Sequence, residues 1–76
     1  MHVIEFNPTR LVEARKRRGL RRERAAVTVD RSAGTITLWE HGRIRPNAEQ
    51  LATLANLYGC DVDEFYDVTS DGEDAA

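Results

Sequence analysis

The apolar positions of the chain recur at helical spacing in short segments, and glycines and helix-capping residues separate these segments. Asn7 followed by Pro8 predicts the start of a first helix, because Asn caps free amide groups and Pro at the first helical position lacks only a donor that has no partner there. Leu11 and Ala14 share its inward face. We expect this helix to continue to about Arg18.

A weaker apolar stripe follows. Ala25, Ala26 and Val29 recur at spacings of three and four, which favours a short second helix from about Arg21. Asp30 then interrupts the pattern. Because Asp tolerates left-handed backbone geometry better than most residues, a tight turn is compatible with this position.

A third helix is predicted directly after this turn, with Ser32 as its N-cap. Ile36 and Trp39 lie on one face of it, and Gly42 marks its end. Pro46 keeps the residue before it out of helical geometry, so a linker follows the third helix.

Two capping-box patterns predict the remaining helices. Asn47 and Gln50 open a fourth helix. Its inward face consists of Leu51, Leu54, Ala55 and Tyr58. Asp61 and Glu64 repeat the pattern and predict a short fifth helix, so the sequence predicts an all-α fold.

The two ends of the chain differ from this helical pattern. Residues 1–6 alternate apolar and polar side chains, which fits either a loosely held arm or a short strand that pairs with its twin across a dimer axis. The fourth and fifth helices are the alternative dimer surface. Residues 68–76 are too polar and acidic to repay ordering, so we expect a disordered tail. The predicted domain then spans residues 7–67.

Charge is sorted along the chain. All eleven Lys and Arg residues lie in the first 45 positions, whose formal charge is +6, and the other 31 positions hold eight acidic residues and a charge of −8. Because screening limits charge interactions to about 8 Å at physiological salt, a polyanion responds to the basic part and not to the net charge. Nucleic acid is therefore the leading partner class.

Several other classes of protein are disfavoured. Cys60 stands alone, which fits a reducing cytosol, and the two histidines lack zinc-ligand spacing. Glu40 and His41 lack the third group that a nucleophilic triad needs. The chain has no apolar run near the ~20 residues of a membrane span. We expect a cytoplasmic protein that is not an enzyme and binds no cofactor or metal.

The second and third helices are separated by about three residues, which is the spacing of a helix-turn-helix unit. The residues that carry a family resemblance are Arg18-Gly19-Leu20, Ala26, Ser32, Thr35-Ile36-Thr37-Leu38-Trp39-Glu40-His41-Gly42-Arg43 and Pro46. With them the chain resembles the Xre family of phage repressor and Cro-like helix-turn-helix proteins. The resemblance implies a five-helix lambda-repressor-like domain that binds a specific duplex sequence, usually as a dimer.

The resemblance also assigns base-reading residues to the exposed side of the third helix. These are Ser32, Ala33, Gly34, Thr37 and Leu38. Ser and Thr bond several base edges and Ala can touch a thymine methyl, but none makes the bidentate pairing of Arg with guanine. Arg31 is the nearest long donor, and its position fits either a base or a phosphate.

Phosphate contacts are implied at Arg22, Arg43, Arg45 and Thr35. Arg22 occupies the first position of the second helix, where the family usually carries Gln bonded to a phosphate, and Arg would add a charge-assisted bond. Arg43 and Arg45 could clamp the same strand from the other side of the groove. We assign a wider basic surface to Arg15, Lys16, Arg17, Arg18, Arg21 and Arg24.

Two hypotheses follow. The first is a sequence-specific DNA-binding transcriptional regulator, a repressor or Cro-like switch that works as a homodimer in the bacterial or phage-infected cytoplasm. The second is a protein-interaction module, antitoxin-like or a phage regulatory partner, that uses the acidic C-terminal half. Ala25, Asp30 and Arg31 depart from the family's usual residues. Either the reading head is partly mobile until DNA orders it, or the recognition surface has decayed and the domain binds protein.

Overall fold

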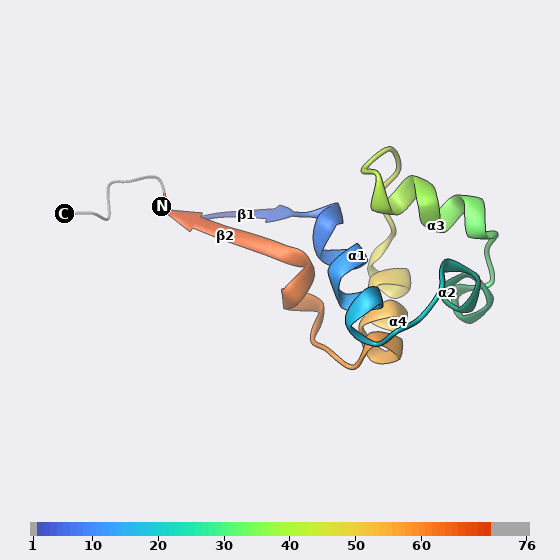
Figure 1. The fold of residues 1–76 in the computed structure, drawn as a ribbon. Coiled ribbons are helices and arrows are strands. Elements are labelled where there is room, and N and C mark those ends of the chain that lie inside the picture. Colours follow the sequence, from blue (N-terminus) through green and yellow to red (C-terminus); the bar gives the residue numbers. More distant parts are fainter. Residues whose placement is uncertain (1, 71–76) are drawn as a thin grey trace.

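The computed structural model describes residues 2–70, and Figure 1 shows a helical body from which a two-stranded ribbon projects. The helices are α1 (Pro8–Arg17), α2 (Arg22–Val29), α3 (Ala33–Glu40), α4 (Ala48–Tyr58) and the short 3-10 helix η1 (Val62–Phe65). The strands are β1 (His2–Phe6) and β2 (Tyr66–Ser70). Every helix within this part of the chain is too short or too polar to cross a membrane.

Side-chain caps fix where three helices begin. The Asn7 side chain accepts a hydrogen bond of 3.0 Å from the amide two residues later, and the Ser32 side chain accepts one of 3.1 Å from the Thr35 amide. Asn47 and Gln50 form both bonds of a capping box at the start of α4. These three predicted helix starts are therefore confirmed.

The turn between α2 and α3 depends on Asp30, which has a left-handed backbone with φ 60° and ψ 50°. The next amide, that of Arg31, donates to the Ala26 carbonyl at 2.9 Å and closes the end of α2. Asp can hold this conformation because its short polar side chain tolerates the left-handed region. The predicted pair of helices and the tight turn between them are confirmed.

The core lies where the helices meet. Its largest fully buried side chains are Tyr58, Phe65, Leu11, Ile36 and Leu54. The Tyr58 and Phe65 rings pack edge to face with their centroids 6.4 Å apart. Ala25 is also fully buried. The small Ala25 side chain is therefore part of the hydrophobic core.

The end of the helical domain differs from the sequence prediction. The segment expected to form a fifth α-helix makes only η1, and the Asp61 side chain makes no capping hydrogen bond. The chain becomes extended at Tyr66, because residues 66–70 pair with β1. Within residues 2–70 the fold therefore has four α-helices and a small sheet, and the five-helix, all-α prediction is corrected. Residues 68–70, expected to be disordered, belong to β2, while residues 71–76 lie outside the described part.

The ribbon consists of two antiparallel strands. Ile4 lies opposite Val68, and Phe6 lies opposite Tyr66. The sequence suggested that the N-terminal strand pairs with its own twin, but in the structure its partner is the C-terminal strand of the same chain. One edge of β1 is thereby used within the protomer.

The base of the ribbon is tied to the start of α1. The Asn7 amide donates to the Phe65 carbonyl at 2.8 Å, and the Asn7 side chain donates to Asp67 Oδ2 at 2.8 Å. Arg10 Nη2 donates to the other oxygen of Asp67 at 2.8 Å. The same asparagine therefore caps α1 and joins the two ends of the chain.

Tyr58 yields a test of the core. Its hydroxyl is buried and has no hydrogen-bond partner within residues 2–70, and burial raises its pKa to about 12. Because a buried polar group without a partner costs about 1–3 kcal/mol, Tyr58→Phe should raise the free energy of unfolding by about 1 kcal/mol in urea titrations at pH 7. Tyr66→Phe, at a half-buried position, is the control and should change stability little. A clear loss of stability in Tyr58→Phe would contradict the account.

Candidate nucleic-acid interface

One side of α3 is open to solvent at the end of the body far from the ribbon (Figure 1). Ser32 and Gly34 are exposed, and Leu38 keeps 39% of its surface accessible. Thr37 is half-buried, and its hydroxyl donates to the Ala33 carbonyl at 3.2 Å. The inward side of the helix carries the buried residues Ile36, Trp39 and Glu40. The outward side is therefore small, uncharged and only weakly polar.

The predicted base-reading residues Arg31, Ser32, Ala33, Gly34, Thr37 and Leu38 all lie on this helix or on the turn before it. Arg31 is exposed, and its Nη1 donates to the Asp30 carbonyl at 2.8 Å. The structure thus keeps this long donor beside the N-terminus of α3.

An open hollow separates this face of α3 from α1 and α2. It is lined by Arg15, Lys16, Leu20, Arg21, Arg22, Glu23, Ala33, Gly34 and Thr37. Arg21 is the N-cap residue of α2 and forms no capping hydrogen bond with its side chain. One wall thus carries Lys16, Arg21 and Arg22 together with Glu23, and the facing wall has the smaller side chains of α3.

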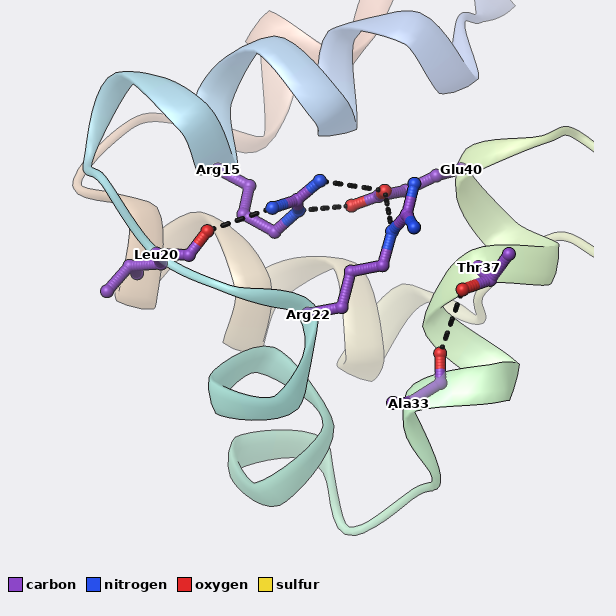
Figure 2. A network of polar contacts seen from close by, with 6 residues as sticks. All are labelled: Arg15, Leu20, Arg22, Ala33, Thr37 and Glu40. Carbon is purple, nitrogen blue, oxygen red and sulfur yellow. Dashed lines mark hydrogen bonds and ion pairs between the residues drawn. The ribbon is translucent and has the colours of Figure 1, made fainter.

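The Glu40 carboxylate joins the elements around the hollow (Figure 2). Glu40 Oε2 accepts a hydrogen bond from Arg15 Nε at 2.7 Å, and Oε1 accepts from Arg15 Nη2 at 3.2 Å and from Arg22 Nε at 2.9 Å. Arg15 Nη1 also donates to the Leu20 carbonyl at 2.9 Å. The side chains of Glu40 and Arg15 are only 1% and 8% exposed, whereas that of Arg22 is 39% exposed. The carboxylate therefore links a buried cation to one that reaches solvent.

The electrostatics of this network favour the charged forms. Burial, the largest single influence, raises the pKa of Glu40, but the hydrogen bonds and charges of Arg15 and Arg22 together outweigh it, and the net pKa is lowered. The hydrogen bond with Glu40 raises the pKa of Arg15 despite its desolvation. Removing Glu40 would leave the buried Arg15 without its charged partner.

Two of the predicted phosphate-binding residues, Arg22 and Thr35, lie in the first turns of α2 and α3. Arg22 forms part of the wall of the hollow, with its Nε committed to Glu40. Thr35 lies in the first turn of α3, where its amide and its hydroxyl each lie 3.1 Å from Ser32 Oγ. The Thr35 side chain therefore supports the helix cap.

The other two predicted phosphate-binding residues do not line the hollow. Arg43 is exposed in the turn after α3. Arg45 lies over the rings of Phe6 and Tyr66, at 5.2 Å and 5.9 Å from their centroids. Because the negative faces of two aromatic rings attract its guanidinium, Arg45 is directed to the base of the ribbon. Arg22 therefore lines the hollow beside α3, whereas Arg45 lines a second hollow with Phe6.

The sequence prediction missed the network itself. The sequence assigns Arg15 and Arg17 to a wider basic surface. In the structure Arg15 is buried on Glu40, and Arg17 pairs with Glu64 at 3.0 Å. One signal was available. Glu40 lies four residues after Ile36, on the inward face of the same helix, and a buried carboxylate requires a cation or hydrogen-bond donors.

Comparison with known proteins agrees with this geometry. A family model described as a helix-turn-helix domain matches residues 9–66. The chain belongs to the helix-turn-helix family. This helix-turn-helix protein is similar to the NMR solution structure of the DNA-binding domain of the P22 c2 repressor, with 28% identity, a TM-score of 0.71 and 76% of each chain covered. The predicted likeness to phage repressor and Cro-like proteins is thereby confirmed, and the fold is typical of regulators without enzymatic activity. No curated protein sequence matches the chain.

Ionisation of Glu40 makes the free energy of unfolding depend on pH. Because its pKa is lower in the fold than in the unfolded chain, its contribution is complete above the usual Glu pKa of about 4.3 and is lost as the pH falls through the folded value. Glu40→Gln should therefore lower the free energy of unfolding at pH 7 by about 3 kcal/mol, since Arg15 becomes an unpaired buried cation. This deficit should shrink at about pH 3 in urea titrations.

Glu64→Gln is the matched control, because Glu64 pairs with Arg17 at an exposed position. It should alter stability little at either pH. An equal deficit of Glu40→Gln at both pH values would contradict the assignment of an ionised, stabilising carboxylate.

Proposed function

We propose that this helix-turn-helix protein is a sequence-specific regulator that binds double-stranded DNA with α3 in the major groove. The observation that carries the proposal is the hollow beside α3, where a cationic wall faces a helix of small side chains. A helix seated in the major groove needs such cations next to it, because phosphate contacts set its register and orientation. By occupying promoter DNA, the protein would act as a repressor or a Cro-like switch.

Arg22 is the proposed central phosphate contact. Glu40 holds its Nε, while its two Nη groups make no hydrogen bond within the described residues. The guanidinium is therefore oriented by one contact and still has donors for a phosphate oxygen. Lys16 and Arg21 add positive charge to the same hollow. We propose Thr35 and Arg43 as further contacts, whereas Arg45 would first have to leave its aromatic rings.

Base reading by α3 would depend mostly on close approach of the helix backbone to the base edges. Ala33 and Gly34 allow the helix backbone to lie near the base edges, and the exposed Leu38 offers an apolar surface to a thymine methyl. The Ser32 and Thr37 hydroxyls already make hydrogen bonds within the helix. DNA shape should therefore contribute strongly to specificity, with Arg31 supplying a direct contact.

A homodimer on a near-palindromic operator completes the proposal. Two copies would place their α3 helices in successive major grooves about 34 Å apart, or at a multiple of that spacing. Both copies would then contribute phosphate contacts, so the affinity would be strongly salt-dependent.

The phosphate contact of Arg22 can be tested through this salt dependence. Each neutralised phosphate contributes about −0.9 to the slope of log affinity against log salt, so Arg22→Ala should reduce the magnitude of the slope by about one unit per protomer. Fluorescence anisotropy with a labelled duplex between low and physiological salt gives both slopes. A slope near zero for the unmodified protein would contradict the proposal.

Arg17→Ala is the control for general loss of charge. Arg17 also carries a positive charge but pairs with Glu64 and does not line the hollow. Its removal should leave the slope nearly unchanged. An equal reduction in both variants would show that the affinity reflects overall charge and not a contact in the hollow.

Sequence specificity requires a separate measurement. Selection of bound duplexes from a random pool should enrich one near-palindromic sequence, whose half-site spacing also reports the dimer geometry. Recovery of unrelated sequences would contradict sequence-specific regulation and favour the hypothesis of a protein partner.

A further inference from the structure

The ribbon exposes apolar side chains and strand edges that lack partners within residues 2–70. Ile4 and Val68, which lie opposite each other, are 66% and 63% exposed. The ribbon projects from the helical body, and the helices approach it only near its base (Figure 1). A two-stranded sheet is marginally stable by itself in water, and an open strand edge is a template for further pairing.

The outer edge of β1 is bordered by a second hollow. It is lined by Ile4, Glu5 and Phe6 on one side and by Pro8, Gly42, Ile44 and Arg45 on the other. Ile44 lies in the segment that leads to α4, and this large apolar side chain is 50% exposed. A strand added along this edge would pair with β1 and would cover Ile4 and Ile44 together.

We propose that β1 of a second copy occupies this edge and that the two β1 strands pair antiparallel about a two-fold axis. The proposal deepens the dimer of the proposed function by naming its surface. The sheet would then contain four strands in the order β2, β1, the partner's β1 and the partner's β2. Such an interface is isologous, because each copy offers the same edge to the other.

The charges along β1 are compatible with this pairing when it is centred on Ile4. Ile4 then lies opposite the partner's Ile4, and Glu5 lies opposite the partner's Val3. No two carboxylates face each other across the new contact, and like charges directly opposite would be destabilising. The acidic residue on the outer strand, Asp67, is already paired with Arg10.

A dimer of this kind leaves the DNA-binding face free. The ribbon and α3 lie at opposite ends of the protomer in Figure 1. Pairing through β1 would therefore join two protomers without covering α3 or the hollow beside it.

Disulfide trapping tests the register directly. In the full chain with Cys60→Ser, the variant Ile4→Cys places two thiols opposite each other across the axis, at a Cβ separation of about 4.5–5.5 Å that small movements bring within disulfide range. Mild oxidation should give a covalent dimer. Val68→Cys, on the outer strand, should remain largely monomeric. Val27→Cys is the control for cross-links that form by random collision, because Val27 is 79% exposed and lies on α2, away from the ribbon.

Sedimentation equilibrium without DNA gives the second measurement. Ile4→Lys places a charge at the centre of the proposed contact and should weaken the dimer by about tenfold or more, equivalent to roughly 1.4 kcal/mol. Val27→Lys introduces the same charge on α2 and should leave the dimer unchanged. Circular dichroism of both variants verifies that the helical body is retained.

Three outcomes would overturn the inference. These are a wild-type protein that stays monomeric at roughly 100 μM, cross-linking through Val68→Cys in preference to Ile4→Cys, and a dimer that Ile4→Lys does not weaken. The result is separable from the proposed function. A protein that cross-links at Ile4→Cys but shows no salt-dependent duplex binding would contradict DNA binding alone, and a monomer that binds duplex would contradict the dimer alone.

Discussion

The arrangement of the helix-turn-helix unit depends on the shared carboxylate of Glu40. This side chain, at the C-terminal end of α3, accepts hydrogen bonds from Arg15 of α1 and from Arg22 of α2. It fixes the distance between α3 and the cationic wall of the hollow, and it orients the guanidinium that we assign to a phosphate. The ion pair with Arg15 is almost fully desolvated, so the cost of removing both charges from water offsets much of their attraction.

Local sequence signals predicted most of the helical body. The caps at Asn7, Ser32 and Asn47 determine helix starts through bonds within three residues, and such bonds can be read from the sequence. The left-handed backbone of Asp30 could also be predicted from the sequence, because it depends on the conformational preference of that residue alone. These signals placed the turn and the outward face of α3, which form the centre of the candidate site.

The features that were missed depend on partners far apart in the sequence. β2 forms because residues 66–70 meet β1, and its pairing spans almost the whole described chain. The positions of Arg15 and Arg45 also follow from distant groups, a buried carboxylate in one case and the rings of Phe6 and Tyr66 in the other. A count of basic residues therefore overestimated the free cationic surface, because Arg15 is buried on Glu40.

The central claim is that α3 and the adjoining hollow form the surface that contacts DNA. An NMR titration of the ¹⁵N-labelled protein with its selected duplex tests this claim residue by residue. We expect the largest amide shifts at the start of α2, on the turn after Asp30 and along α3, while the amides of η1 and β2 change little. Shifts concentrated in η1 and β2, with α3 unaffected, would contradict the claim.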